Sequence, residues 1–313
     1  MAVKVVTVFG GGGFIGRYVV RALARADIRI RVAQRQPDRA GFLRPMGRLG
    51  QISLVAANVR DDASVAAAVE GADCVINLVG ILYQHGRQRF AAVHAEAAGR
   101  IARFARAAQA GRLVHFSALG ADPHSPALYA QSKAAGERAV LAEFPDATIM
   151  RPSIVFGPED DFFNKFAIMA RLAPALPLIG GGRTRFQPVF VGDVAEAVHR
   201  ALDAPEARGR VYELGGPKVY TFKELLQIVL AETGRRRLLV PVPFWAAELI
   251  GSLAQLSPLP PLITRDQVLM LKSDAVVAPG ADGLVALGLA PTALELIVPT
   301  YLRRFRRSAW AEV

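Results

Sequence analysis

A serine, a tyrosine and a lysine in the first half of the chain have a spacing that could support acid–base chemistry. Tyr129 and Lys133 are four residues apart in the string YAQSK, so on a helix both side chains lie on one face. A free tyrosine has a pKa of about 10, and a neighbouring ammonium lowers it by favouring the phenolate. Ser117, upstream, can hold a substrate oxygen. We therefore predict Ser117, Tyr129 and Lys133 as candidate catalytic residues.

Four consecutive glycines near the start of the chain form a second chemical feature. The residues before them, 3–9, are β-branched or apolar apart from one lysine and predict a buried strand. From Phe14 onward the apolar spacing is helical. A glycine turn between a strand and a helix lets backbone N–H groups approach a pyrophosphate, and the helix N-terminus adds partial positive charge. The stretch therefore predicts a dinucleotide-binding turn.

The spacing of these glycines leaves two registers open. Gly11, Gly13 and Gly16 fit G-x-G-x-x-G, whereas Gly10, Gly13 and Gly16 fit G-x-x-G-x-x-G. In both registers Gly16 lacks a side chain, so the helix can pack close to the strand. The strand before the turn and the helix after it favour a ligand-binding turn over a flexible turn without a ligand.

Two arginines favour one form of the nicotinamide cofactor. Residues 28–33 predict the second strand, and Gln34 and Arg35 follow where NAD-specific sites carry an acidic residue for the ribose 2′-OH. Arg17 directly follows the last glycine of the turn. Guanidinium groups pair well with phosphate oxygens, so Arg17 and Arg35 favour NADP(H) over NAD(H). Two solvated surface arginines are the alternative in a chain this rich in arginine.

Strand and helix patterns alternate through the first half of the chain. Further strands are predicted at residues 52–56, 74–79 and 113–116, with helices between them. This order predicts an α/β fold with a Rossmann-type doubly wound parallel sheet, followed by a smaller C-terminal mixed α/β lobe. We expect an NADP(H)-binding domain at residues 1–157 and a substrate-type or interaction lobe at 158–313. Parts of 185–215 are expected to return to the Rossmann sheet.

Composition narrows the classes of function. The 313 residues carry a net charge of +11 and are 52% hydrophobic, which supports a large core and anionic partners. The only cysteine, Cys74, excludes an internal disulfide, and we expect no metal site. No apolar run is long enough to cross a bilayer, and the first apolar run reads as a strand rather than a signal peptide. No nucleic-acid-binding motif is present, so we expect no nucleic acid as a partner.

Several motifs together resemble a known family. GGGGFIGR, NLVG, Ser117, Tyr129-x-x-x-Lys133 and RPSIVFGP resemble the extended and atypical short-chain dehydrogenases/reductases of the NAD-dependent epimerase/dehydratase family. FLRPMGRLGQ, INLVGI, YAQSKAAGERAV and RFQPVFVGDVAEAV are similar to the NADPH-binding accessory subunits of respiratory complex I, the NADH:ubiquinone oxidoreductase. The resemblance covers nearly the whole chain.

The resemblance implies a function without established turnover. Members of the accessory-subunit family hold NADPH as a structural cofactor and support assembly and stability of the complex near the quinone site. Expected partners are complex I core subunits near the membrane-arm junction. The expected location is peripheral, on the cytoplasmic side of the bacterial inner membrane or the mitochondrial matrix side. The intact Ser117, Tyr129 and Lys133 leave an alternative open, an active NADP-dependent reductase or epimerase.

The same resemblance assigns residues to the cofactor. Asn58 stands where many members have an aspartate that touches adenine, and Phe9 where many have a threonine. The expected NADPH-binding residues are Gly10, Gly13, Phe14, Ile15, Gly16, Arg17, Arg35, Asn58, Val59, Leu78, Val79, Gly80, Tyr129, Lys133, Pro152 and Ile154.

The C-terminal part offers contact surfaces and helix starts. Residues 243–256 are apolar, and residues 301–310, YLRRFRRSAW, mix aromatic and basic side chains, which suits an interface or an anionic lipid surface. An ordinary packed helix and an ordinary charged tail are the alternatives. Three capping boxes are predicted, beginning at Thr221, Thr264 and Thr292.

Overall fold

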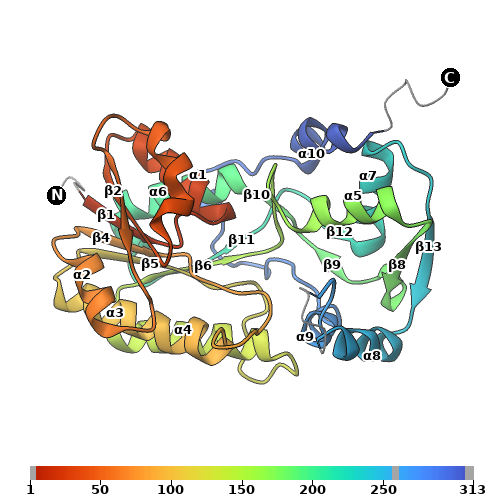
Figure 1. The fold of residues 1–313 in the computed structure, drawn as a ribbon, viewed down its shortest axis with the longest axis horizontal. Coiled ribbons are helices and arrows are strands. Elements are labelled where there is room, and N and C mark those ends of the chain that lie inside the picture. Colours follow the sequence, from red (N-terminus) through yellow and green to blue (C-terminus); the bar gives the residue numbers. More distant parts are fainter. Residues whose placement is uncertain (1–4, 256–260, 307–313) are drawn as a thin grey trace. The chain divides into compact units, whose positions relative to one another are not determined.

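The computed structural model of the chain describes residues 5–255 and 261–306 (Figure 1). By the density of contacts within it, the chain divides into two compact units. The first comprises the chain up to Pro152, Gly192–Leu214 and Gly280–Leu289, and the second comprises the remainder.

A seven-stranded parallel sheet forms the centre of the first unit. Its order is β11-β6-β5-β4-β1-β2-β3, and every neighbouring pair is parallel. The order of the strands reverses between β1 and β4, which is where open α/β sheets place their ligands. The predicted doubly wound parallel sheet is therefore confirmed. The strands are β1 (Val5–Phe9), β2 (Arg29–Gln34), β3 (Ile52–Ala56), β4 (Cys74–Asn77), β5 (Arg112–Phe116), β6 (Thr148–Pro152) and β11 (Val211–Leu214).

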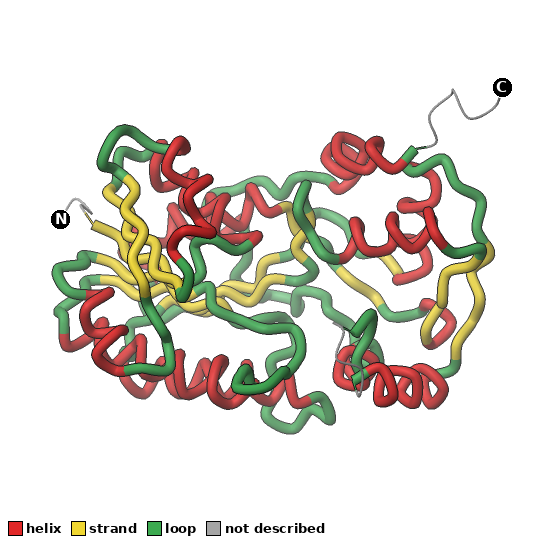
Figure 2. The backbone as a smooth tube through the Cα atoms, viewed as in Figure 1, coloured by secondary structure: helices red, strands yellow, loops and turns green. Residues whose placement is uncertain are grey.

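Helices cover both faces of this sheet, with α1 and α6 on one face and α2, α3 and α4 on the other (Figures 1 and 2). Because both faces are covered, central strands such as β1 are buried along nearly their whole length. The helical segment between β4 and β5 begins with a wide, π-helical turn at Ala91–Glu96. The helices are α1 (Phe14–Arg25), α2 (Asp62–Val69), α3 (Ala97–Ala107), α4 (Leu128–Glu143) and α6 (Val191–Asp203).

Two later segments of the chain return to the first unit. The strand β11 pairs with β6, so that Leu214 lies opposite Pro152. Residues 280–289 also return, and the Glu213 amide donates to the carbonyl of Asp282 at 2.8 Å. This second return was not among the expectations from the sequence.

The second unit is built from short strands and helices around an aromatic core. Phe162, Phe163, Phe166 and Phe222 pack with ring centroids 5.1–6.1 Å apart. Its strands pair in twos, β10 with β7, β12 with β9 and β13 with β8. The elements are β7 (Val155–Phe156), α5 (Phe162–Leu172), β8 (Ala175–Ile179), β9 (Arg185–Phe186), β10 (Val189–Phe190), β12 (Tyr220–Thr221), α7 (Phe222–Glu232), β13 (Leu238–Val242), α8 (Phe244–Ala254), α9 (Arg265–Met270) and α10 (Leu294–Leu302).

Two of the three predicted capping boxes are present. Thr221 and Thr264 each accept a hydrogen bond from the backbone three residues on, and the reciprocal side-chain bond is made in both cases. The box predicted from Thr292 is wrong, because α10 begins after Ala293. The carboxylate of Glu295 instead accepts a hydrogen bond from the Tyr220 hydroxyl at 2.6 Å.

Candidate functional site

The glycine turn after β1 closes tightly on itself. Gly10 has a φ of +80°, a conformation that favours glycine, and its carbonyl accepts the Gly13 amide at 3.0 Å. A Cβ placed on Gly16 would lie 2.4 Å from the Gly10 oxygen and 2.6 Å from the Cα of Gly11. At Gly16 the helix therefore lies close against the glycine turn, where the sequence had predicted close packing on the strand.

The start of α1 has the properties of an anion-binding site. The helix begins after Gly13 and carries no acidic residue in its first turn, which includes Phe14 and Ile15. The first N–H groups of a helix have no partner within the helix, and its dipole places partial positive charge there. Beside it, a Cβ on Gly12 would lie within van der Waals radii of the Gln34 amide oxygen. Backbone N–H groups in this glycine-lined cradle can therefore approach a diphosphate without side chains in between.

Each of the two candidate arginines has an orienting neighbour. The Arg17 guanidinium lies 4.9 Å from the centre of the Phe42 ring, in a cation–π contact. Arg35 is exposed, and its guanidinium donates to the amide oxygen of Gln88 when that amide is oriented to satisfy both groups. Both arginines belong to the first unit. Arg17 directly follows the last glycine of the motif, and Arg35 directly follows the end of β2.

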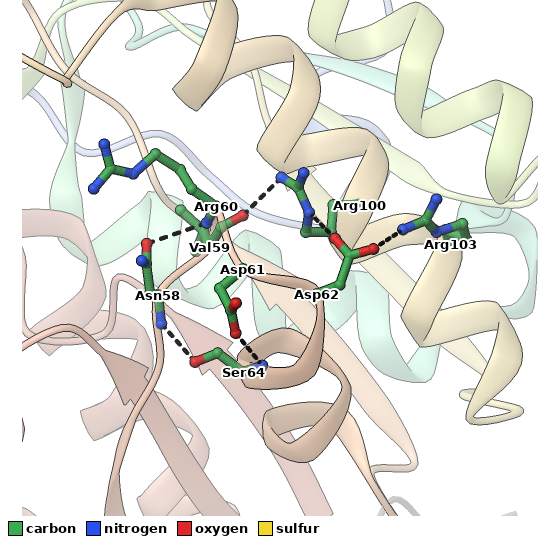
Figure 3. Close-up of polar contacts among 8 residues, drawn as sticks. All are labelled: Asn58, Val59, Arg60, Asp61, Asp62, Ser64, Arg100 and Arg103. Carbon is green, nitrogen blue, oxygen red and sulfur yellow. Dashed lines mark hydrogen bonds and ion pairs between the residues drawn. The ribbon is translucent and has the colours of Figure 1, made fainter.

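Asn58 is held in the turn that follows β3 (Figure 3). The backbone N–H of Asn58 donates to Ser64 Oγ at 2.8 Å, and the side-chain oxygen of Asn58 accepts a hydrogen bond from the backbone N–H of Arg60 at 3.2 Å. Asp61 caps α2 by accepting the Ser64 amide at 2.7 Å. An aspartate at position 58 could accept the same hydrogen bond from the Arg60 amide. The turn is therefore preserved although this chain has Asn58 where many family members have an aspartate.

The next residues in this loop are fastened to α3 (Figure 3). Arg100 binds the Asp62 carboxylate and also donates to the Val59 carbonyl at 3.1 Å. Arg103 reaches the other oxygen of Asp62 at 2.7 Å. The hydrogen bond from Arg100, with the charges of both arginines, keeps the pKa of Asp62 below its usual value. The backbone at Val59 is thereby fixed near the sheet edge.

The loop after β4 is held by side chains on both sides. Leu78 donates to the Phe9 carbonyl at 3.0 Å, which fixes this loop beside the glycine turn. Asn77 Oδ1 accepts the Val79 amide at 3.1 Å, and His94 Nε2 accepts the Ile81 amide at 3.0 Å. Gly80 lies between these two anchors, and a Cβ there would be 3.6 Å from Lys133 Nζ.

His94 connects this loop to the helix that carries the tyrosine. Because Nε2 accepts from Ile81, neutral His94 carries its proton on Nδ1, which donates to Ser132 Oγ at 2.8 Å. Ser132 in turn donates to the Tyr129 carbonyl at 2.7 Å. Burial, with a smaller contribution from the Lys133 charge, lowers the pKa of His94 to about 3, so the ring is neutral at physiological pH. The hydrogen bonds therefore run in one direction from the loop to α4.

Tyr129 and Lys133 share one face of α4, as the spacing predicted. The Tyr129 ring packs edge-on against Phe90 and His94, with centroids 5.8 and 5.4 Å away. Lys133 is buried, and its ammonium lies 5.9 Å from the centre of the Tyr129 ring. Burial lowers the pKa of Lys133 to about 8. A cation in this position favours the phenolate of Tyr129.

Ser117 lies where β5 ends, and its backbone amide donates to the Met150 carbonyl at 2.8 Å. The side chain is 4% exposed, and within the described part of the chain Oγ has no hydrogen-bond partner. Buried hydroxyl groups are normally hydrogen-bonded, so an unpartnered one at a strand end suits a ligand oxygen.

The last two expected cofactor residues fall in different units. Pro152 ends β6 in the first unit, where its carbonyl accepts the Leu119 amide at 3.0 Å. Ile154 belongs to the second unit, where its carbonyl accepts the Val189 amide at 2.9 Å. All the other expected site residues lie in the first unit.

Four residues of this constellation were missed at the sequence level: Asn77, Gln88, His94 and Ser132. Ser132 stands inside the YAQSK string and could have been flagged by its place between the tyrosine and the lysine. No pattern in the sequence relates His94 to Ile81 or Gln88 to Arg35, because both contacts depend on how the loop after β4 folds back.

Metal chemistry has no support among the residues that the structure describes, since no group of three His, Cys, Asp or Glu side chains is placed to hold an ion. Cys74 is buried in β4, and burial raises the pKa of its thiol to about 12. The thiol is therefore not a nucleophile at neutral pH.

The described part of the C-terminal aromatic-basic stretch packs inside the second unit. Tyr301 is buried and donates to the Asp160 carboxylate at 2.6 Å, and Arg304 donates to Asn164 Oδ1 at 2.5 Å. Arg306 donates to the Glu232 carbonyl at 2.8 Å. Tyr301 is therefore not part of an exposed surface, whereas Arg303, Arg304 and Arg306 remain exposed. Residues 307–310 lie outside the described part, and contact with a partner or with lipid at this stretch stays a prediction. Across residues 5–255 and 261–306, none of the helices is both long and apolar enough to span a bilayer.

Comparisons with known proteins agree with this geometry. Residues 6–215 match the NAD dependent epimerase/dehydratase family. The NADH dehydrogenase (ubiquinone) 1 alpha subcomplex subunit 9, mitochondrial, of Rattus norvegicus is 38% identical over 98% of this chain and 81% of its own length. The protein of the same name from Arabidopsis thaliana is 36% identical over 97% of this chain and 78% of its own. The X-ray structure of Pal from Bacillus thuringiensis has a TM-score of 0.75 at 16% identity, covering 97% of this chain and all of that one, which is a likeness of fold.

Proposed function

Since the chain belongs to the NAD dependent epimerase/dehydratase family, and within it to the group of the alpha subcomplex subunit 9 proteins, we propose that it is an accessory subunit of respiratory complex I. In this proposal the chain binds NADPH as a structural cofactor and stabilises the complex near its quinone site. The proposal rests on two observations together. The chain has a glycine turn shaped to bind a dinucleotide, and its similarity to the relatives extends over 98% of its length.

The proposed cofactor residues follow from the geometry of the first unit. The diphosphate would be bound by backbone N–H groups between Gly10 and Ile15, at the start of α1. The loop Leu78–Gly80 would contact the nicotinamide half, because it lies beside the glycine turn at the reversal of strand order. Asn58 and Val59, in the fixed turn after β3, would contact the adenine.

A preference for NADPH rests on the two arginines. The residue directly after β2, where the ribose 2′-OH would need an acceptor, is Arg35 and not an acidic residue. Arg17 and Arg35 would bind a 2′-phosphate through charge-assisted hydrogen bonds. The chemistry of these donors therefore favours the phosphorylated dinucleotide.

A second candidate function is an active NADP-dependent reductase or epimerase, and the unpartnered Ser117 hydroxyl favours it. In that case the nicotinamide supplies or accepts the hydride. Ser117 would hold the substrate oxygen, Tyr129 would move the proton, and Lys133 would hold the ribose and lower the pKa of the tyrosine. In the structural function the same three groups help to retain the nucleotide by hydrogen bonding.

A pair of variants separates the two functions in the assembled complex. Tyr129→Phe would leave respiratory activity near normal in the structural case. Gly13→Val would lose nucleotide and assembled complex together, because a Cβ there already lies 3.2 Å from the Gly10 oxygen. Gly41→Val is the matched control, since nothing lies within 4 Å of its added Cβ. Oxidation of NADPH by the isolated protein with a carbonyl substrate, abolished by Tyr129→Phe, would overturn the structural proposal.

Partners and location complete the proposal. We assign nucleotide binding to residues 1–157 and contact with complex I core subunits, near the membrane-arm junction, to residues 158–313. The location would be peripheral, on the cytoplasmic face of a bacterial inner membrane or on the matrix side in mitochondria. The relatives' name, mitochondrial subunits of an NADH dehydrogenase, supports the partner and the compartment.

A further inference from the structure

The loop after β4 carries a small hairpin at residues 85–88. The His85 amide donates to the Gln88 carbonyl at 3.0 Å, and the Gln88 amide donates to the His85 carbonyl at 2.9 Å. Gly86, in the turn, has a φ of +54°, a conformation that favours glycine. The hairpin therefore has a defined backbone that presents its side chains and carbonyl groups at fixed positions.

Two arginines from other segments of the first unit bind this hairpin. In the orientation of the Gln88 amide that satisfies both groups, Arg35 donates to its oxygen through Nη1 and, at 3.2 Å, through Nη2. Arg60, in the turn after β3, donates from Nη1 to the Arg87 carbonyl at 3.0 Å. Because β2 and β3 are neighbours in the sheet, adjacent hairpin residues hold guanidinium groups from the ends of two neighbouring strands.

These two arginines are not paired with carboxylates in the described part of the chain. The carboxylate of Asp62 is bound by Arg100 and Arg103, and Figure 3 shows the Arg60 side chain turned away from it. The partners of Arg35 and Arg60 on the hairpin are both neutral oxygens. Two cations without a paired anion raise the local positive potential, which attracts an anionic group.

The hydrogen bonds to the hairpin orient both guanidinium groups and leave donors for a ligand. A guanidinium carries five N–H donors in a planar fork. Nε of Arg35 and of Arg60 takes part in neither bond, so each fork keeps an edge, formed by Nε and one Nη, for a phosphate. A neutral amide orients Arg35 without cancelling its charge, which a carboxylate at the same position would do.

We propose that Gln88 and Arg60 complete the site for the 2′-phosphate of NADPH. Gln88 is a positioning residue that holds the Arg35 guanidinium in place, and Arg60 is a further cation that the hairpin backbone holds beside it. The inference rests on the proposed binding of NADPH and adds two residues that set the preference for a 2′-phosphate over a 2′-OH. Since the same loop begins at Leu78–Gly80, one segment contacts both halves of the dinucleotide.

Fragments of the nucleotide isolate the 2′-phosphate in a binding experiment. The full chain, freed of nucleotide, is titrated in a calorimeter with adenosine 2′,5′-bisphosphate and with adenosine 5′-monophosphate, which differ only in that phosphate. The ratio of these two affinities measures the discrimination, and the ratio for NADPH and NADH checks it on the whole dinucleotides. We expect the unmodified protein to favour the 2′-phosphorylated member of each pair, less strongly as salt is raised.

Variants of Gln88 separate the orientation of Arg35 from simple stability. Gln88→Leu is expected to lower the ratio by about fivefold to tenfold, with unchanged affinity for the monophosphate, because Arg35 loses the group that orients it. Gln88→Glu can still accept from Arg35 and keeps the hairpin contact, but its charge opposes the phosphate, so the ratio should fall at least as far. A purely structural role of Gln88 predicts no loss of discrimination in Gln88→Glu.

Arg60 is tested against a matched loss of charge. Arg60→Gln is expected to lower the ratio by about tenfold and to make its salt dependence shallower, because one cation no longer meets the phosphate. Arg29→Gln removes the same charge from an exposed arginine at the opposite end of β2 from Arg35, and should leave the ratio unchanged. Affinity for the monophosphate reports whether each variant keeps the rest of the site.

The inference and the proposed function fail in different ways. Tight NADPH binding with a ratio that is unchanged or higher in Gln88→Leu, or that is equal in Arg60→Gln and Arg29→Gln, would overturn the inference alone. Binding of neither dinucleotide by the unmodified chain would overturn both.

Discussion

The ammonium of Lys133 donates a hydrogen bond to the carbonyl oxygen of Phe116 at 3.0 Å, the residue directly before Ser117. This bond ties α4 to the end of β5 and brings the lysine to the strand that carries the serine. The negative charge of Glu137 stabilises the Lys133 ammonium, but the Glu137 carboxylate also accepts two hydrogen bonds from Arg151, at 2.8 and 2.6 Å. The buried lysine therefore keeps a charge that is only partly compensated, which suits a site for an anionic ligand.

The charge of Lys133 predicts a pH dependence of nucleotide binding. Burial lowers its pKa from 10.5 to about 8, so the ammonium is charged at pH 7 and is lost as the pH rises through about 8. We expect NADPH affinity, measured by calorimetry, to fall between pH 7 and 9. In Lys133→Met the affinity should be lower at pH 7 and this slope should disappear.

The lowered pKa of Lys133 also affects the stability of the protein. The free energy of unfolding is expected to rise with pH, whereas the affinity for NADPH is expected to fall. Between about pH 8 and 10.5 the unfolded chain binds the lysine proton and the folded chain does not, so this group raises the free energy of unfolding as the pH rises.

The binding experiment also has an outcome that would contradict the role of Lys133. A slope of NADPH affinity with pH that is identical in Lys133→Met and in the unmodified protein would show that the lysine is not part of the binding site.

Arg35 is expected to decide between the two nicotinamide dinucleotides. Arg35→Asp removes charge-assisted hydrogen bonds to a 2′-phosphate and adds a repulsion, so NADPH binding should weaken by about 2 kcal/mol or more. NADH binding should be unchanged or improved, since aspartate can accept from the ribose 2′-OH. Arg44→Asp, on the segment Pro37–Met46, is a control for net charge. Equal affinity of the unmodified protein for NADH and NADPH in calorimetry would contradict this assignment.

His94 is expected to couple the loop after β4 to α4. His94→Phe keeps a ring beside Phe90 and Tyr129 but leaves the Ile81 amide and Ser132 without their partner. The free energy of unfolding should fall by about 1–3 kcal/mol. NADPH should also dissociate faster than this loss of stability alone explains, because the loop at Gly80 is released. His94→Gln, which can keep one acceptor and one donor, should restore part of the affinity. Dissociation rates by stopped-flow fluorescence that are unchanged in His94→Phe would remove the histidine from the site.

Much of the fold was predictable because its signals are local. The Gly10–Gly16 spacing, the buried strand before it and the alternation of strands and helices each depend on neighbouring residues, and the parallel sheet follows from their order. The YAQSK string placed Tyr129 and Lys133 on one helix face for the same reason. The caps at Thr221 and Thr264 also depend only on residues three positions apart.

The failures came where partners distant in sequence compete for a side chain. Glu295 was assigned to a capping box with Thr292, but it accepts from Tyr220, 75 residues away. Tyr301 looked like a surface aromatic, but a buried carboxylate, Asp160, takes its hydroxyl. The two partners of His94 depend on the π-helical turn at Ala91–Glu96 and on the loop after β4, and neither has a local signal.

The most direct test of the central claim is to isolate the protein from its native membranes without added nucleotide. The bound nucleotide is then identified by mass spectrometry, and the co-purifying polypeptides are identified in the same fraction. The account predicts about one NADPH per chain, retained through purification, in a fraction that contains core subunits of complex I. A chain that elutes alone, without nucleotide or with NADH, and that reduces a carbonyl substrate would contradict it.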